Sequence, residues 1–86
     1  MDINVLIATV KKKLIDEIEI ENINIEDKSF LHKNHRGNEK GKFHLKISIK
    51  SNQLKQMGKI NSNKKVYKTL DSELKQFIHS IQILID

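Results

Sequence analysis

The sequence predicts a small α+β domain, an αββαβ sandwich, from three observations. Apolar residues recur at helical spacing near the N-terminus and again in the last third of the chain. Between them, two segments alternate apolar and polar residues with a period of two, which is typical of β-strands. A third alternating segment ends the chain. Because the 86 residues contain no proline and no linker-like stretch, we expect residues 1–86 to form one domain.

The first expected element is a helix over residues 3–17. Its apolar stripe consists of Ile3, Ile7, Val10 and Leu14. This spacing brings the four side chains to one face of a helix. Asp2 precedes the stripe and can accept hydrogen bonds from the first free N–H groups.

Two strands are expected next. β-Branched residues alternate with polar ones over 19–26, which predicts a strand. The alternation shifts at Asn22, which indicates either a bulge or a strand that starts late. Residues 28–41 have the glycine- and asparagine-rich chemistry of a loop. Alternation over 43–49 is the clearest strand signal, and we expect it to pair with the first strand as an antiparallel hairpin.

The remainder predicts a helix and a third strand. Residues 52–63 fit one helical turn followed by a loop, because Asn61, Ser62 and Asn63 follow Gly58. Helical spacing then returns at Val66, Leu70, Leu74 and Phe77. Ser62 or Asn63 is the expected N-cap of this helix. Alternation over 79–85 predicts the last strand.

Composition excludes several classes of protein. The chain has no cysteine, so disulfides, thiolate metal sites and cysteine nucleophiles are absent. No apolar run approaches the roughly 20 residues of a membrane helix, and the N-terminus does not resemble a secretory signal. We therefore expect a cytoplasmic protein that contacts no membrane, or an organellar one if a presequence is missing. No nucleophile–base pair, three-ligand metal site or glycine-rich phosphate loop stands out, so we expect no enzyme.

Charge is unevenly distributed along the chain. Residues 14–27 contain six acidic and no basic side chains, whereas residues 28–68 contain twelve Lys or Arg and one acid, Glu39. A basic segment of this kind attracts phosphate or an acidic protein surface. A solvated lysine-rich surface is the simpler interpretation, and the sequence leaves both open.

Four segments carry a resemblance to a known family. They read DKSFLHKNHRGN at 27–38, GKFHLKISIKS at 41–51, KVYKTLDSEL at 65–74 and FIHSI at 77–81. In this order and spacing they resemble the BolA-like proteins. The resemblance implies a fold similar to a type II KH domain, with a three-stranded mixed sheet covered by helices. That similarity is one of fold, and the G-x-x-G loop with which a KH domain contacts nucleic acid is absent here.

The resemblance implies a non-enzymatic adaptor that binds a monothiol glutaredoxin. Such a protein takes part in iron–sulfur cluster assembly or trafficking, or in iron homeostasis. It holds no cofactor alone, is a monomer when free, and shares a bridged [2Fe–2S] cluster with its partner. The candidate cluster ligands are His32 and His35. The family's R-H-R histidine is replaced by Asn63, and an amide is a poor ligand for cluster iron.

The partner would bind a groove between residues 28–41 and 59–68. The candidate partner-binding residues are Asn63, Lys64, Lys65, Tyr67 and Lys68. An alternative function is a nucleic-acid-binding transcriptional regulator that uses the basic segment Lys59–Lys68. Two further histidines, His44 and His79, are expected to be structural. His44 should be exposed or half-buried with a local hydrogen bond, because it opposes the apolar parity of its strand.

Overall fold

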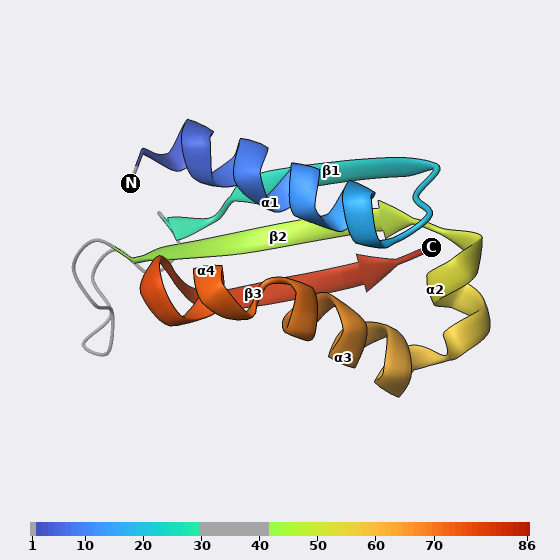
Figure 1. Ribbon diagram of the computed structural model, residues 1–86. Coiled ribbons are helices and arrows are strands. Elements are labelled where there is room, and N and C mark those ends of the chain that lie inside the picture. Colours follow the sequence, from blue (N-terminus) through green and yellow to red (C-terminus); the bar gives the residue numbers. More distant parts are fainter. Residues whose placement is uncertain (1, 30–41) are drawn as a thin grey trace.

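The computed structural model describes residues 2–29 and 42–86, which form a three-stranded sheet with four helices (Figure 1). The elements, in chain order, are α1 (Ile3–Glu17), β1 (Asn22–Asp27), β2 (Phe43–Lys50), α2 (Asn52–Met57), α3 (Lys59–Thr69), α4 (Asp71–Gln76) and β3 (Ile78–Ile85). The predicted α+β class and αββαβ order are therefore confirmed, with the second helical region divided into α2, α3 and α4.

The sheet is mixed, as expected, and has the order β1-β2-β3. β1 pairs antiparallel with β2, and Ile25 lies opposite Ile47. β3 pairs parallel with β2, and Ile83 lies opposite Ile47 on the other side. A parallel pair needs a crossover connection, which α2, α3 and α4 provide. Figure 1 shows α1, α3 and α4 on one face of the sheet, with α2 at the end where β2 stops.

The hydrophobic core lies between the sheet and these helices. It is built from one stripe of α1, the inward face of β2 and single residues of the crossover. Its buried members are Leu6, Val10, Leu14, Ile18, Leu45, Ile47, Ile49, Leu54, Val66, Leu70 and Ile78. The opposite face of the sheet carries mostly polar side chains, with Leu84 as an exposed apolar exception, because the alternation of each strand sends every second residue away from the helices.

The N-terminal half follows the sequence closely. α1 spans the predicted residues, and Asp2 caps it by accepting a hydrogen bond of 3.0 Å from the backbone N–H of Asn4. β1 begins at Asn22, and its pairing with β2 is unbroken from Asn22 to Asp27. Of the two interpretations of the shifted alternation, the late start is therefore correct, and no bulge interrupts this strand pair.

The prediction of a loop within residues 52–63 is wrong. α3 already begins at Lys59, so Asn61, Ser62 and Asn63 lie inside the helix and neither of the last two is its N-cap. Their side chains bond to the helix itself: Ser62 Oγ and Asn63 Nδ2 donate to the Lys59 carbonyl over 3.0 Å and 2.8 Å. These residues favour loops because they compete for backbone groups, but here that competition takes place within the helix.

Gly58 makes the sharp junction that the sequence did not reveal. It joins α2 to α3 with φ of 81°, a conformation that side-chain-bearing residues rarely adopt. A single residue therefore separates the two helices. Ser51 fixes the start of α2, because its hydroxyl accepts a hydrogen bond from the Leu54 N–H and donates one of 2.6 Å to the Glu19 carbonyl.

Candidate partner-binding site

The outward-facing side of α3 presents apolar side chains to solvent. Ile60 is 72% exposed and Tyr67 is 44% exposed, although both are large and apolar. Seven residues separate them, so they lie two turns apart on one side of the helix. With Lys59, Asn63 and Lys64 they line a shallow hollow of about 510 Å³, which we call the α3 surface.

The opposite side of α3 holds this surface in place. Ser62, Val66 and the following Leu70 are buried against the rest of the domain. Because these residues are spaced four apart, they lie on one side of the helix and fix its rotation about its axis. Ile60 and Tyr67 are therefore kept outside by the same packing that buries Val66.

The α3 surface is positively charged at its rim. Lys59 and Lys64 are exposed, and in residues 2–29 and 42–86 no carboxylate lies within 4.0 Å of either ammonium group. An apolar centre bordered by unpaired cations suits an acidic partner surface. Tyrosine suits the centre of such a surface, because it combines a large apolar ring with a hydroxyl.

The structure divides the five predicted partner-binding residues between two surfaces. Asn63, Lys64 and Tyr67 belong to the α3 surface. Lys65 and Lys68 instead line a separate hollow of about 480 Å³ between α3 and α1, together with the carboxylate-bearing residues Asp16 and Glu17. Asn63 is half-buried, and its amide already donates to the Lys59 carbonyl.

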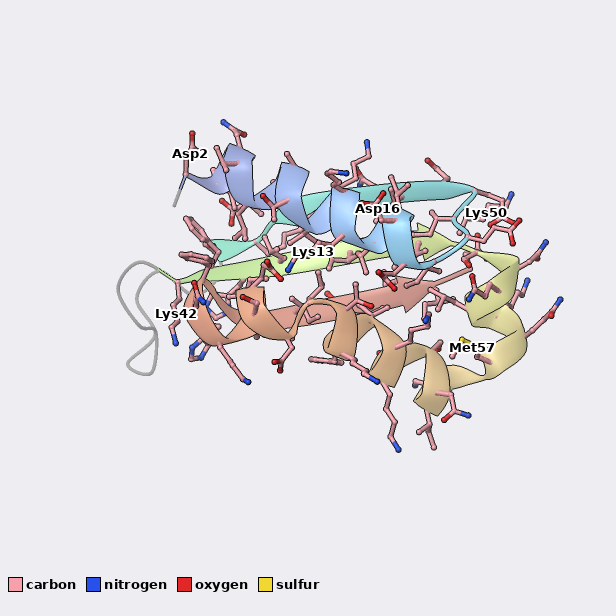
Figure 2. The ribbon with its side chains drawn as sticks, viewed as in Figure 1. Asp2, Lys13, Asp16, Lys42, Lys50 and Met57 are labelled. Atoms are coloured by element: carbon pink, nitrogen blue, oxygen red, sulfur yellow. The ribbon has the colours of Figure 1, made fainter. Side chains whose placement is uncertain are left out.

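The predicted groove between residues 28–41 and 59–68 involves residues outside the described part of the chain. Residues 30–41, with His32 and His35, lie in that undescribed part. The residues that flank it are described. Figure 2 shows Lys42 at the end of the sheet where β2 begins, whereas Met57, just before α3, lies at the opposite end. The first turn of α3 therefore lies far from the residues that flank the 28–41 segment.

His44 is buried, contrary to the exposed or half-buried position expected for it. It retains 4% of its exposure, and its Nδ1 lies 2.7 Å from the Ser80 hydroxyl. Its backbone is also held, because its N–H donates to Ser29 Oγ over 3.0 Å and its carbonyl accepts from the Lys28 N–H over 2.7 Å. A hydrogen bond is thus present, but its partners, Ser29 and Ser80, are distant in the sequence and not local as expected. The burial follows from contacts with neighbouring chain segments, which alternation alone does not reveal.

His79 lies next to His44 but is exposed. The centroids of the two rings are 4.9 Å apart and the rings are tilted by 56°. In the part of the chain that the structure describes, the His44 ring is the only recorded side-chain partner of His79. The structural role expected for His79 therefore rests on one ring contact, and the residue is exposed beside His44, whose backbone bonds to Ser29 and Lys28 at one flank of residues 30–41.

Sequence reasoning missed two residues of interest, and each had a signal. Ile60 lies on the same side of α3 as Tyr67. The seven-residue spacing of these two residues could have shown this, but only if residues 61–63 had been predicted as helix and not as loop. His79 was recognised within FIHSI, but its position beside the start of β2 depends on the parallel pairing of β3 with β2. Over residues 2–29 and 42–86, no group of three or more His, Cys, Asp or Glu side chains could hold a metal ion.

None of the described helices has the length and apolar character needed to cross a membrane. The longest, α1, has 15 residues and carries charged side chains on its outer face. This agrees with the absence of a membrane-spanning pattern in the sequence.

Comparisons with known proteins agree with this architecture. A family model described as BolA-like protein matches residues 14–85. No curated protein matches the chain. Among solved structures, the chain is similar to the BolA domain of SufE1 from Arabidopsis thaliana, with a TM-score of 0.77 and 24% identity over 92% of this chain and 87% of that one.

Two further structures have the same fold. BolA1 from Arabidopsis thaliana is 26% identical, with a TM-score of 0.75 and coverage of 91% of this chain and 86% of that one. BolA1 from Mus musculus is 19% identical, with a TM-score of 0.71, and the similarity covers 90% of this chain and 60% of the mouse chain.

Proposed function

This chain belongs to the BolA-like protein family, and on that premise we propose that it is a non-enzymatic adaptor whose partner is a monothiol glutaredoxin. Its task would lie in iron–sulfur cluster assembly or trafficking, or in iron homeostasis. The observation that carries the proposal is the α3 surface, where Ile60 and Tyr67 are exposed between unpaired lysines. Exposed apolar side chains that are fixed by a rigid helix are a typical feature of protein-binding sites.

A bridged [2Fe–2S] cluster would need imidazole ligands from this chain. Cluster iron accepts histidine nitrogen in place of cysteine sulfur, and the chain contains no cysteine. His79 is exposed at the start of β3, near the flanks of the segment that carries His32 and His35. We therefore add His79 to His32 and His35 as a candidate ligand. The amide of Asn63 already donates to its own helix and does not fit this role.

These residues would supply ligands and nothing else. Because the described residues lack a group of three potential ligands, the remaining coordination would come from the partner. The cluster itself supplies electron transfer and exchangeable iron and sulfide when it is bound. The part of this chain would be to orient an imidazole and to hold the partner through α3.

The geometry favours a protein partner over the alternative of nucleic acid. The four lysines of α3 do not form one basic stripe, because Lys65 and Lys68 face the hollow that they share with Asp16 and Glu17. Only Lys59 and Lys64 remain on the α3 surface. One tyrosine does not make a stacking platform for successive bases. These features make nucleic acid the less suitable partner.

The substitution Ile60→Ala tests the α3 surface. Truncating an apolar residue at the centre of an interface costs about 1–2 kcal/mol, which corresponds to roughly tenfold weaker binding. Ile15→Ala is the control, because Ile15 is an isoleucine on α1 that is also exposed, at 47% against 72% for Ile60. Isothermal titration calorimetry with a monothiol glutaredoxin should show weaker binding for Ile60→Ala and an unchanged affinity for Ile15→Ala. Equal affinities for the two variants would exclude the α3 surface as the binding site.

The substitution His79→Ala tests the cluster ligand. The visible absorption and circular dichroism of a glutaredoxin-bound [2Fe–2S] cluster should change when the wild-type protein is added, because an imidazole replaces another ligand. His79→Ala should abolish that change, whereas Asn63→Ala should leave it intact. Loss of the change in Asn63→Ala with retention in His79→Ala would reverse the assignment.

A further inference from the structure

β3 forms one edge of the sheet. The strand order β1-β2-β3 gives it a single partner, β2, within the described residues. An edge strand presents unpaired backbone groups that another extended chain can use. β3 has eight residues, so its edge is long enough for several hydrogen bonds.

Backbone hydrogen bonds just after the C-terminal end of β3 show which of its backbone groups point toward β2 and which point toward the open edge. The N–H of Asp86 donates to the Ile49 carbonyl over 2.8 Å, and the Asp86 carbonyl accepts from the Ser51 N–H over 3.2 Å. Both groups of Asp86 therefore point toward β2. Because successive residues of a strand point their backbone groups to opposite sides, Leu84 also points toward β2, whereas Ile83 and Ile85 point toward the open edge.

A groove lies directly beside this open edge. It has a volume of about 400 Å³ and runs between the C-terminal half of β3 and the junction of α2 with α3. Its walls include Leu54, Lys55, Lys59, Ser62, Ile83 and Ile85. A chain that paired with Ile83 and Ile85 would place every second side chain on the same side of the sheet as theirs, within this groove.

The positive charge of the groove favours an acidic ligand. Lys55 and Lys59 are exposed, and no carboxylate in the described part of the chain lies within 4.0 Å of either ammonium group. No aromatic side chain lines the groove, so it offers no ring on which a nucleic-acid base could stack. Apolar walls and two unpaired cations fit an extended peptide that has small apolar and acidic side chains.

We propose that the open edge of β3 binds an extended acidic segment of a partner protein as a fourth strand. The segment would exchange backbone hydrogen bonds with Ile83 and Ile85, insert an apolar side chain into the groove, and place carboxylates near Lys55 and Lys59. A second copy of this chain is a poorer occupant. Each copy carries a net charge of +5, and the acidic strand β1 already directs Glu26 to Lys28 and Lys46.

Amide hydrogen exchange of the full chain, followed by NMR, tests this proposal. The probe is an acetylated and amidated peptide of two glutamates followed by alternating valine and threonine, eight residues in all. At saturating peptide, exchange of the Ile83 and Ile85 amides should slow by about tenfold or more, while Leu84, already bonded to β2, changes little. Protection of neither amide, at peptide concentrations up to solubility, would overturn the proposal.

The charge preference is tested by Lys55→Glu. This variant should bind the acidic peptide at least about tenfold more weakly and should bind a peptide with two lysines in place of the glutamates more tightly. Lys11→Glu on α1 changes the net charge equally and should leave both affinities unchanged.

Two other results would contradict the inference. Shifts of the Lys55–Asn63 amides with oligothymidylate, but not with the acidic peptide, would assign the groove to nucleic acid. Protection of Ile83 and Ile85 that rises with protein concentration alone would assign the edge to a second copy. The groove shares Lys59 and Asn63 with the α3 surface, but no glutaredoxin is present in these experiments, so their results do not depend on whether one binds.

Discussion

A buried carboxylate connects α1 to α4. Glu73 is 6% exposed, and its two oxygens accept from Lys13 Nζ over 2.9 Å and 2.7 Å. Figure 2 shows Lys13 reaching from α1 toward the crossover helices. Because an ionised carboxylate is costly to bury without a partner, this ion pair stabilises one packing of α1 against α4.

Removing the lysine should therefore reduce stability. We expect Lys13→Met to lower the free energy of unfolding by about 1–2 kcal/mol, since Glu73 loses its partner but water still reaches the vacated site. The matched control is Lys12→Met. Lys12 pairs with Asp16 on the exposed side of α1, and its loss should cost less than about 0.5 kcal/mol. Urea denaturation measures both, and equal losses would contradict a special role for the buried pair.

At the same scale, single residues show where sequence reasoning fails. His44 was expected to be exposed or half-buried because it opposes the apolar alternation, and it does lie on the face of β2 opposite to Leu45, Ile47 and Ile49. It is buried by Ser80, His79 and the chain around Ser29, which come from distant parts of the sequence. Periodicity reports the face of a strand and says nothing about what covers that face.

At the scale of elements, the junction at Gly58 sets the position of the α3 surface. Its φ of 81° turns the chain from α2 into α3 in one residue. The last turn of α2 and the first turn of α3 both have backbone groups without intrahelical partners, and no side chain caps the start of α3. The junction therefore depends on the backbone conformation of Gly58.

Gly58→Ala should cost about 1 kcal/mol of unfolding free energy. A methyl group built at Gly58 would meet nothing within 4 Å, so the penalty comes from the backbone conformation alone. Gly58→Asn should cost a similar amount, because ψ of 164° places Gly58 outside the left-handed helical region that asparagine tolerates and in a region that is essentially restricted to glycine. Thermal denaturation followed by circular dichroism would compare the three proteins. A melting temperature of either variant equal to that of the wild type would show that the conformation is not maintained.

The elements that sequence predicted best are those whose apolar pattern matches their packing. α1, β2 and β3 each bury one continuous face, so their alternation or helical spacing gave near-correct bounds. α3 was shortened in the prediction because three polar residues at 61–63 suggested a loop. In the structure, burial of Ser62 against the rest of the domain overrides this local preference.

At the scale of the whole molecule, three surfaces have different chemistry. The α3 surface combines exposed apolar side chains with cations. The end of the sheet at the start of β3 carries the exposed His79, and the opposite end carries the groove beside the β3 edge. The α3 surface and the groove share Lys59 and Asn63, whereas His79 belongs to neither, so one small domain could hold a partner through α3 while it offers an imidazole at one end. The sequence indicated the basic helix and the histidines, but their relative positions depend on the crossover from β2 to β3.

The adaptor proposal is tested most directly by one NMR titration. Isotope-labelled protein would be titrated with an unlabelled monothiol glutaredoxin, and the amide shifts would be followed for every assigned residue. We predict saturable shifts that centre on Ile60, Lys64 and Tyr67, with smaller shifts near His79. Absence of any shift at concentrations up to the millimolar range, or shifts confined to α1, would contradict binding of this partner through the α3 surface.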